Sequence, residues 1–113
     1  MAEPLIDLAI FKELQDTAGA DFVGELVDTF REEAPLMLDE LRSAHAARDA
    51  ERYRRAAHSL KSNSLTFGAL GLGAMARELE LAGPGAPASD AAVESLAQEY
   101  ARVAAALKAL RHG

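Results

Sequence analysis

Apolar side chains recur every three or four residues along most of this chain, a spacing that is typical of amphipathic helices. We expect helices over residues 7–15, 21–46, 49–66 and 69–81, and a fifth that begins near Asp90. No stretch alternates apolar and polar residues clearly enough to predict a half-buried strand. The pattern therefore predicts an all-α protein.

The apolar stripes of the first two helices indicate how far each helix extends. The first stripe contains Leu8, Phe11 and Leu14, and the second contains Phe22, Val23, Leu26, Val27, Phe30, Ala34, Leu38 and Leu41. Proline inside a helix normally ends or kinks it. Because the second stripe continues in register beyond Pro35, we expect one long helix with a kink that ends near Ala46.

The fifth predicted helix carries apolar residues at alternating spacings of three and four. They are Val93, Leu96, Tyr100, Val103, Leu107 and Leu110. A coiled-coil zipper has the same spacing, but here it lasts only about two and a half heptads. We interpret it as the core stripe of an antiparallel four-helix bundle, with the short helix over residues 7–15 capping one end. Residues 1–113 are expected to form a single domain, with a surface turn over residues 83–89.

Composition excludes several classes of function. Half of the residues are apolar and 27% are charged, which is typical of a globular protein. The chain has no cysteine, so disulfides, thiolate metal sites and a thiol nucleophile are excluded. Its net charge of -6 argues against nucleic acid or an anionic membrane as a general partner. No apolar run approaches the roughly 20 residues of a membrane span, and no secretory signal is visible, so we expect a cytoplasmic protein.

His58 stands out in the segment AAHSLKSNSLTFGA, residues 56–69, on the third predicted helix. With about 100° per residue, its side chain lies almost opposite the core stripe and is expected to face solvent. The expected core stripe contains Tyr53, Ala56, Leu60 and Phe67. The residues expected within about 60° of His58 are Glu51, Arg54, Arg55, Lys61, Ser62 and Leu65.

These neighbours make His58 a candidate phosphoryl acceptor. Positive neighbours disfavour the imidazolium and keep a neutral, nucleophilic nitrogen available. The same charges, above all Lys61, would stabilise a phosphoryl group on that nitrogen. No carboxylate is expected beside the ring, because Ser59 follows it and Glu51 lies two turns away.

The surface around His58 also contains candidate contacts for a partner. Arg54, Arg55 and Ser62 share its face, and Ser62 is small enough to leave room for a partner to approach. Leu65 is expected about 20° from His58, where an apolar side chain serves no core. It is either a stray surface leucine, which is common, or part of an apolar contact surface.

Motifs for independent phosphoryl chemistry are absent from the sequence. There is no G-x-x-x-x-G-K-[ST] or G-x-G-x-x-G nucleotide loop, and no metal motif such as H-E-x-x-H. A nucleophile and a cation without a base, metal or ATP site cannot start phosphoryl transfer alone. They can accept and return a phosphoryl group if a partner brings the rest. We therefore expect a phosphoryl carrier with no cofactor, kinase activity or phosphatase activity of its own.

The same segment resembles histidine-containing phosphotransfer (HPt) domains. Their usual pattern is A-H-x-L-K-G, a short spacer, G-A, then L and L-E at helical spacing. Residues 57–61 match A-H-x-L-K, residues 68–69 match G-A, and Leu72 and residues 79–80 match the later positions. Upstream, the Ile-Asp opening and the F-x-x-x-A-P stretch over residues 30–35 fit as well, so the resemblance covers essentially the whole chain.

The resemblance implies an HPt four-helix bundle in which His58 is phosphorylated on Nε2 by a receiver aspartyl-phosphate and passes the group to another receiver. Lys61 would offset the phosphoryl charge, and the receiver would supply the acidic pocket and Mg²⁺. Response-regulator receivers and a hybrid sensor histidine kinase are the implied partners. Residues 66–68, T-F-G, are similar to the phosphoacceptor domain of chemotaxis-type kinases, whose donor is a kinase domain. Ser62 stands where the family most often has glycine, which affects how closely a partner packs.

Two alternatives stay open at this point. The chain could be a non-catalytic module that binds a receiver or kinase through the same face, or a structural helical bundle without a signalling role.

His45, near the end of the second predicted helix, is interpreted as a solvated residue that interacts favourably with the helix dipole.

Overall fold

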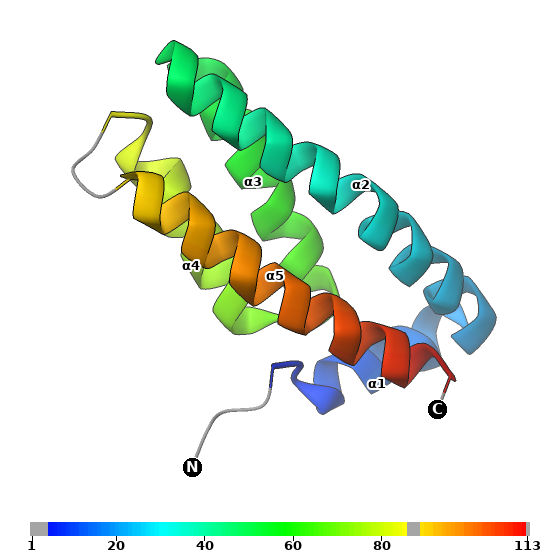
Figure 1. The fold of residues 1–113 in the computed structure, drawn as a ribbon. Coiled ribbons are helices and arrows are strands. Elements are labelled where there is room, and N and C mark those ends of the chain that lie inside the picture. Colours follow the sequence, from blue (N-terminus) through cyan, green and yellow to red (C-terminus); the bar gives the residue numbers. More distant parts are fainter. Residues whose placement is uncertain (1–4, 86–88, 113) are drawn as a thin grey trace.

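The computed structural model describes residues 5–85 and 89–112, and over these residues the chain forms five helices and no strand (Figure 1). They are α1 (Leu8–Ala18), α2 (Ala20–Ala47), α3 (Ala50–Thr66), α4 (Leu70–Ala82) and α5 (Ser89–His112). The predicted all-α class is confirmed, and each predicted helix is present with ends that differ by a few residues. The surface turn predicted over residues 83–89 lies partly outside the described residues.

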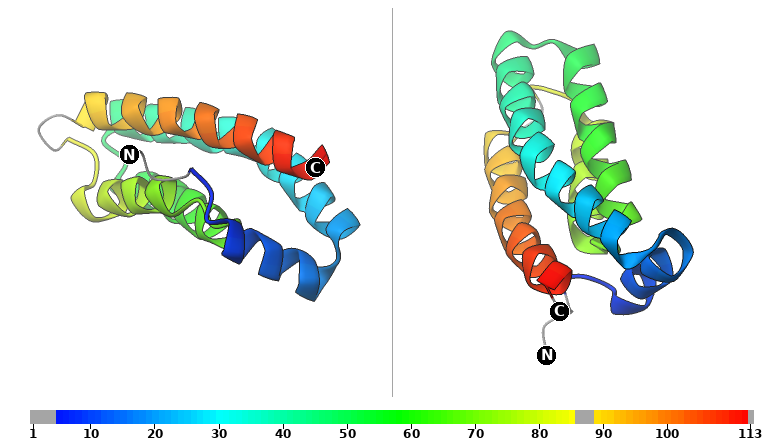
Figure 2. Two further views of the ribbon diagram at one scale, coloured as in Figure 1. Left: turned by 90° about the horizontal axis from the view of Figure 1, so that it is seen from below. Right: turned by 90° about the vertical axis from the view of Figure 1, so that its right-hand side faces the viewer.

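The helices share one hydrophobic core. α2 and α4 each pack against both α3 and α5, while α1 lies across one end and packs against α2 and α3 (Figures 1 and 2). The core contains side chains from all five helices, among them Phe11, Val27, Phe30, Leu41, Tyr53, Leu60, Leu72, Leu96 and Leu107. Five of the six residues in the predicted stripe of α5 are buried, and the sixth, Leu110, is partly buried. The stripe therefore packs within this chain.

Aspartate side chains cap the first turns of α1 and α3. Asp49 precedes α3, and its carboxylate accepts a hydrogen bond from the backbone N–H of Arg52 at 3.2 Å. Asp7 precedes α1 and accepts hydrogen bonds from the N–H groups of Ala9 and Ile10 at 3.0 and 3.3 Å. A side chain at this position satisfies N–H groups that have no partner within the helix. Both helix starts are therefore encoded locally.

The long helix α2 runs through Pro35, as the apolar pattern predicts. Proline has no N–H, so the carbonyl of Arg31, four residues earlier, loses its partner in the helix. The hydroxyl of Tyr100 on α5 donates a hydrogen bond to that carbonyl at 3.3 Å. The Tyr100 ring also packs edge-on against Phe30, with 5.7 Å between ring centroids. α5 thus satisfies the backbone group that the proline leaves without a partner.

Two residues of the predicted stripes face solvent instead of the core. Leu8 is 59% exposed and Phe22 is 51% exposed. Residues three apart drift by about 60° around a helix, so a stripe centred on the buried Phe11 leaves Leu8 at its edge. Phe22 lies about 100° from Val23, which is fully buried, and therefore falls beyond the buried face of α2.

Because the two faces of α3 differ in burial, truncating a side chain on each face should lower the free energy of unfolding by different amounts. Leu60 is fully buried, whereas the His58 side chain is 54% exposed. We expect Leu60→Ala to lower the free energy of unfolding by about 2–5 kcal/mol because it leaves a cavity. His58→Ala should lower it by at most about 1 kcal/mol, because it removes one partly exposed hydrogen bond and leaves no cavity in the core. Urea denaturation followed by circular dichroism measures both, and equal losses would contradict this assignment of faces.

The hydrogen bond between Tyr100 and the Arg31 carbonyl can be tested by a double-mutant cycle. Tyr100→Phe should lower the free energy of unfolding by about 1 kcal/mol in the natural background. Pro35→Ala supplies an N–H for the same carbonyl, so Tyr100→Phe should cost less in that background. Thermal and urea denaturation of the four proteins give the coupling, and the same cost in both backgrounds would show that the hydroxyl does not replace the missing N–H.

Candidate functional site

His58 lies in the middle of α3 on the side that faces away from the core. Its side chain is 54% exposed, while Tyr53, Ala56, Leu60 and Ser64 on the other side of the helix are buried. The predicted orientation of the helix is therefore correct. A residue in mid-helix is held by the backbone hydrogen bonds of the turns on both sides, so the ring is presented from a rigid element.

A carboxylate from α4 contacts the ring, which sequence reasoning did not expect. His58 Nδ1 lies 2.8 Å from Glu80 Oε2, and Lys61 Nζ donates a hydrogen bond to Glu80 Oε1, also at 2.8 Å. Glu80 is only 14% exposed. The prediction that the nearest charges are positive and that no carboxylate lies beside the ring is wrong. A single carboxylate joins the candidate nucleophile to the candidate cation.

The signal for Glu80 was present in the sequence, but only as part of the family pattern. The Leu79–Glu80 pair supported the resemblance without a role being assigned to the glutamate. Glu80 follows His58 by 22 residues and belongs to another helix. Angles around α3 cannot reveal such a neighbour, because its position depends on how α4 packs.

The electrostatics of this contact decide which ring nitrogen is reactive. The hydrogen bond from Lys61 and, next, that with His58 hold the pKa of Glu80 below its ordinary value, so Glu80 is a carboxylate. A carboxylate only accepts hydrogen bonds. The proton of the neutral ring therefore lies on Nδ1, which donates it to Glu80, and Nε2 carries the lone pair. Among the described residues, none forms a hydrogen bond with Nε2.

Close packing of α3 on α4 brings Glu80 within reach. A Cβ atom at Gly73 would lie 2.6 Å from Leu65 Cδ2 and 3.7 Å from the Lys61 carbonyl oxygen, so the Leu65 side chain occupies the space that glycine leaves between the two helices. Glu80 follows Gly73 by two turns on the same helix face. Gly68, at a φ of 83°, forms the turn between the helices. In that turn the N–H of Ala69 donates to the Ser64 carbonyl at 2.9 Å.

The other predicted site residues lie around this contact. Arg54, Arg55 and Ser62 are exposed on α3. Leu65 is 43% exposed. A groove of about 370 Å³ between α3 and α4 is lined by Lys61, Leu65, Leu70, Gly73, Ala74, Arg77, Glu78 and Leu81. Leu65 is thus one wall of an apolar groove that begins at Lys61, and the sequence alone did not reveal this groove.

His45 is not a solvated residue, contrary to the interpretation from the sequence. Its side chain is 14% exposed, and Nε2 forms a hydrogen bond with the carboxylate of Asp90 at the start of α5. Its ring centroid also lies 6.4 Å from that of Tyr53. Asp90 lies 45 residues away along the chain, so this contact too depends on the packing of the helices. His45 joins the end of α2 to the start of α5.

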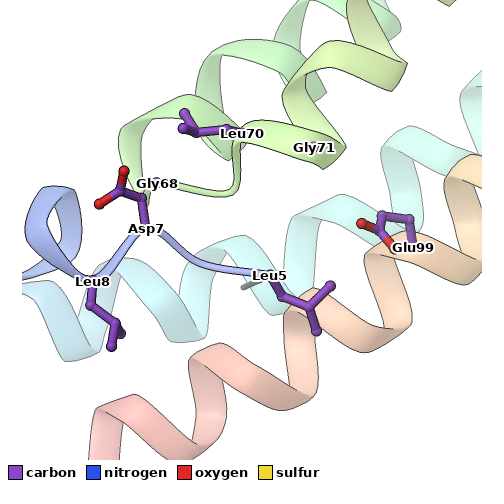
Figure 3. A pocket seen from close by; sticks show the side chains of 7 residues that line it. All are labelled: Leu5, Asp7, Leu8, Gly68, Leu70, Gly71 and Glu99. Carbon is purple, nitrogen blue, oxygen red and sulfur yellow. The ribbon is translucent and has the colours of Figure 1, made fainter. Parts of the chain in front are cut away.

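Other features of the described residues do not form a second chemical site. A groove of about 530 Å³ is lined by Leu5, Asp7, Leu8, Gly68, Leu70, Gly71 and Glu99 (Figure 3). Its two carboxylates have structural partners, because Asp7 caps α1 and Glu99 pairs with Arg102. Within residues 5–85 and 89–112, no three His, Asp or Glu side chains are grouped to hold a metal ion. No helix in this part of the chain is long and apolar enough to cross a membrane.

Comparison with known proteins agrees with the resemblance seen in the sequence. The family model of the Hpt domain matches residues 25–112, which include His58, Lys61 and Glu80. The crystal structure of histidine-containing phosphotransfer protein B (HptB) from Pseudomonas aeruginosa PAO1 is similar, with a TM-score of 0.88 and 30% sequence identity. The match covers 98% of this chain and 97% of that chain. No curated protein matches the sequence. With the fold, the motif and the family model in agreement, this chain belongs to the Hpt domain family.

Proposed function

We propose that His58 is the phosphoryl acceptor of a histidine phosphotransfer protein in a two-component phosphorelay. It accepts the group from a receiver aspartyl-phosphate, or from a kinase, and passes it to a response-regulator receiver. The observation that carries this proposal is the contact of His58 Nδ1 with Glu80 Oε2, 2.8 Å apart, on an exposed helix face. An ionised Glu80 accepts the Nδ1 proton of the neutral ring, which leaves the Nε2 lone pair directed away from the carboxylate.

The transfer is a direct displacement between two side chains. The Nε2 lone pair attacks phosphorus, the N–P bond forms, and the O–P bond to the receiver's aspartate breaks with its electron pair going to that carboxylate. Lys61 lies one turn after His58 on the same face, where its ammonium can offset the charge of the phosphoryl group. The receiver supplies the acidic pocket and Mg²⁺, so this chain contributes the nucleophile and one cation.

The surface around His58 suits docking of a receiver. Arg54 and Arg55 present positive charge on a protein whose net charge is -6, which steers an acidic pocket toward the ring. On the α4 side, the groove beside Leu65 gives apolar area for contact. Ser62 lies between the two and is small enough for close approach. We propose these four residues as the receiver-docking surface.

We propose that the helices α2 to α5, which present this surface, form an antiparallel four-helix bundle with α1 as its cap. The chain then acts as a single phosphotransfer domain in the cytoplasm, where it meets its receivers and a hybrid or chemotaxis-type kinase. The packing of α2 and α4 against both α3 and α5 supports this arrangement. Binding without transfer, by a non-catalytic module, is the alternative that the following experiment separates.

Phosphoryl transfer from a radiolabelled phosphoreceiver tests the role of His58. The natural protein should acquire an adduct that is labile to acid and stable to base, as expected for phosphohistidine. His58→Gln should abolish it, because glutamine has no nucleophilic nitrogen, while His45→Gln should keep it. An equal adduct in His58→Gln would contradict the assignment. Receiver binding that survives His58→Gln, with no transfer to the natural protein, would identify a binding module.

Separate substitutions can test the charged part and the apolar part of the docking surface. Replacing both Arg54 and Arg55 by Glu should slow association with a receiver by about tenfold or more at low salt. Leu65→Ser should mainly speed dissociation, because it removes apolar contact. Surface plasmon resonance at several salt concentrations measures both rates.

Lys108→Glu is the control for these charge changes. Lys108 is exposed on α5, and α3 and α5 do not pack against each other within the described residues. It should therefore leave both rates close to those of the natural protein. An equal effect of Lys108→Glu and of the arginine substitutions would show that total charge, and not this surface, controls association.

A further inference from the structure

Glu80 binds two groups that phosphoryl transfer also uses, and this inference rests on the function proposed for His58. One carboxylate oxygen accepts the Nδ1 proton of His58, and the other accepts a hydrogen bond from Lys61, each at 2.8 Å. With a side chain that is 14% exposed, Glu80 is partly shielded from water. Its negative charge therefore acts on the ring and on the lysine with less screening than a fully exposed carboxylate.

The first consequence concerns Lys61. In the unphosphorylated protein its ammonium already neutralises the charge of Glu80. A phosphoryl group on Nε2 brings further negative charge to the same neighbourhood. The group must then share the ammonium with Glu80, and it is repelled by the carboxylate. Both effects raise the free energy of the phosphorylated state.

The second consequence concerns the departure of the phosphoryl group. Glu80 holds a proton on Nδ1 while Nε2 carries phosphorus. When the N–P bond breaks, its electron pair returns to Nε2 and the ring leaves as neutral imidazole. Without the Nδ1 proton, the same step would release an imidazolate, which is a much poorer leaving group. The hydrogen bond to Glu80 therefore lowers the barrier to release, although it does not by itself shift the equilibrium.

We propose that Glu80 sets the phosphoryl-transfer equilibrium of His58 and shifts it toward the receiver. Competition for Lys61 and repulsion of the phosphoryl group act in this direction, and in this proposal they outweigh the attraction of Glu80 for the positive charge that the phosphorylated ring carries with its Nδ1 proton. In the return step, an oxygen of the receiver's aspartate attacks phosphorus, the O–P bond forms, the N–P bond breaks, and the Nδ1 proton stays on the ring. Glu80 thus makes phospho-His58 a group that is readily passed on rather than stored.

Glu80→Gln is the informative variant, because glutamine keeps the shape and a carbonyl oxygen for the Nδ1 proton but loses the charge. Glu25→Gln is the matched control, since Glu25 is an exposed residue of α2 and its loss changes the net charge equally. Each protein is brought to equilibrium with a phosphorylated receiver, and the ratio of phosphohistidine to phosphoaspartate is measured. We expect Glu80→Gln to raise this ratio about tenfold, the size of one charge interaction at a partly exposed site, and Glu25→Gln to leave it unchanged.

A second measurement does not need the receiver. The proteins are phosphorylated with phosphoramidate, a small phosphoryl donor, and the donor is removed. The half-life of phospho-His58 should be several-fold longer in Glu80→Gln than in the natural protein and in Glu25→Gln. Circular dichroism confirms that all three proteins are folded.

The outcomes separate this inference from the proposed function. If the natural protein accepts no phosphoryl group from either donor, the proposed function fails. If it accepts the group, and the equilibrium ratio of Glu80→Gln equals that of Glu25→Gln or moves toward the receiver, the inference about Glu80 is overturned. A purely structural role of Glu80 would slow transfer in both directions and leave the ratio unchanged.

Discussion

The close approach of α3 and α4 is the constraint on which the site depends. Gly73 leaves space for the Leu65 side chain, and a Cβ atom there would lie 2.6 Å from Leu65 Cδ2. With the helices this close, Glu80 reaches both His58 and Lys61 on the neighbouring helix. The same packing forms the groove beside Leu65. The packing of α3 on α4 thereby influences both the chemistry of the ring and the surface offered to a partner.

The division of α3 into two faces gives the site its rigidity. Tyr53 and Leu60 anchor one face in the core, while His58 and Lys61 occupy the other. A side chain that is supported from behind by a packed helix keeps its position better than one on a loop, so less ordering is needed when a partner docks. The Asp49 cap and the turn at Gly68 define where this helix begins and ends.

Charge is arranged locally, although the protein as a whole is acidic. Glu80 and Lys61 neutralise each other beside the ring, so Arg54 and Arg55 supply the positive character of the exposed face. This differs from a ring surrounded by cations. The ring is oriented by an anion, and the anion is kept ionised mainly by the lysine. Glu80 therefore orients the ring, while Arg54 and Arg55 attract the partner.

The sequence alone determined the five helices, the continuation of α2 through Pro35 and the outward face of His58, because each follows from the period of a single helix. It also carried the motif that identifies the family. Tertiary structure decided that Glu80 contacts His58 and that His45 pairs with Asp90. Helical periodicity places a side chain around its own axis, but contacts between helices depend on the distance and rotation at which those helices pack. Only the folded chain sets these two quantities.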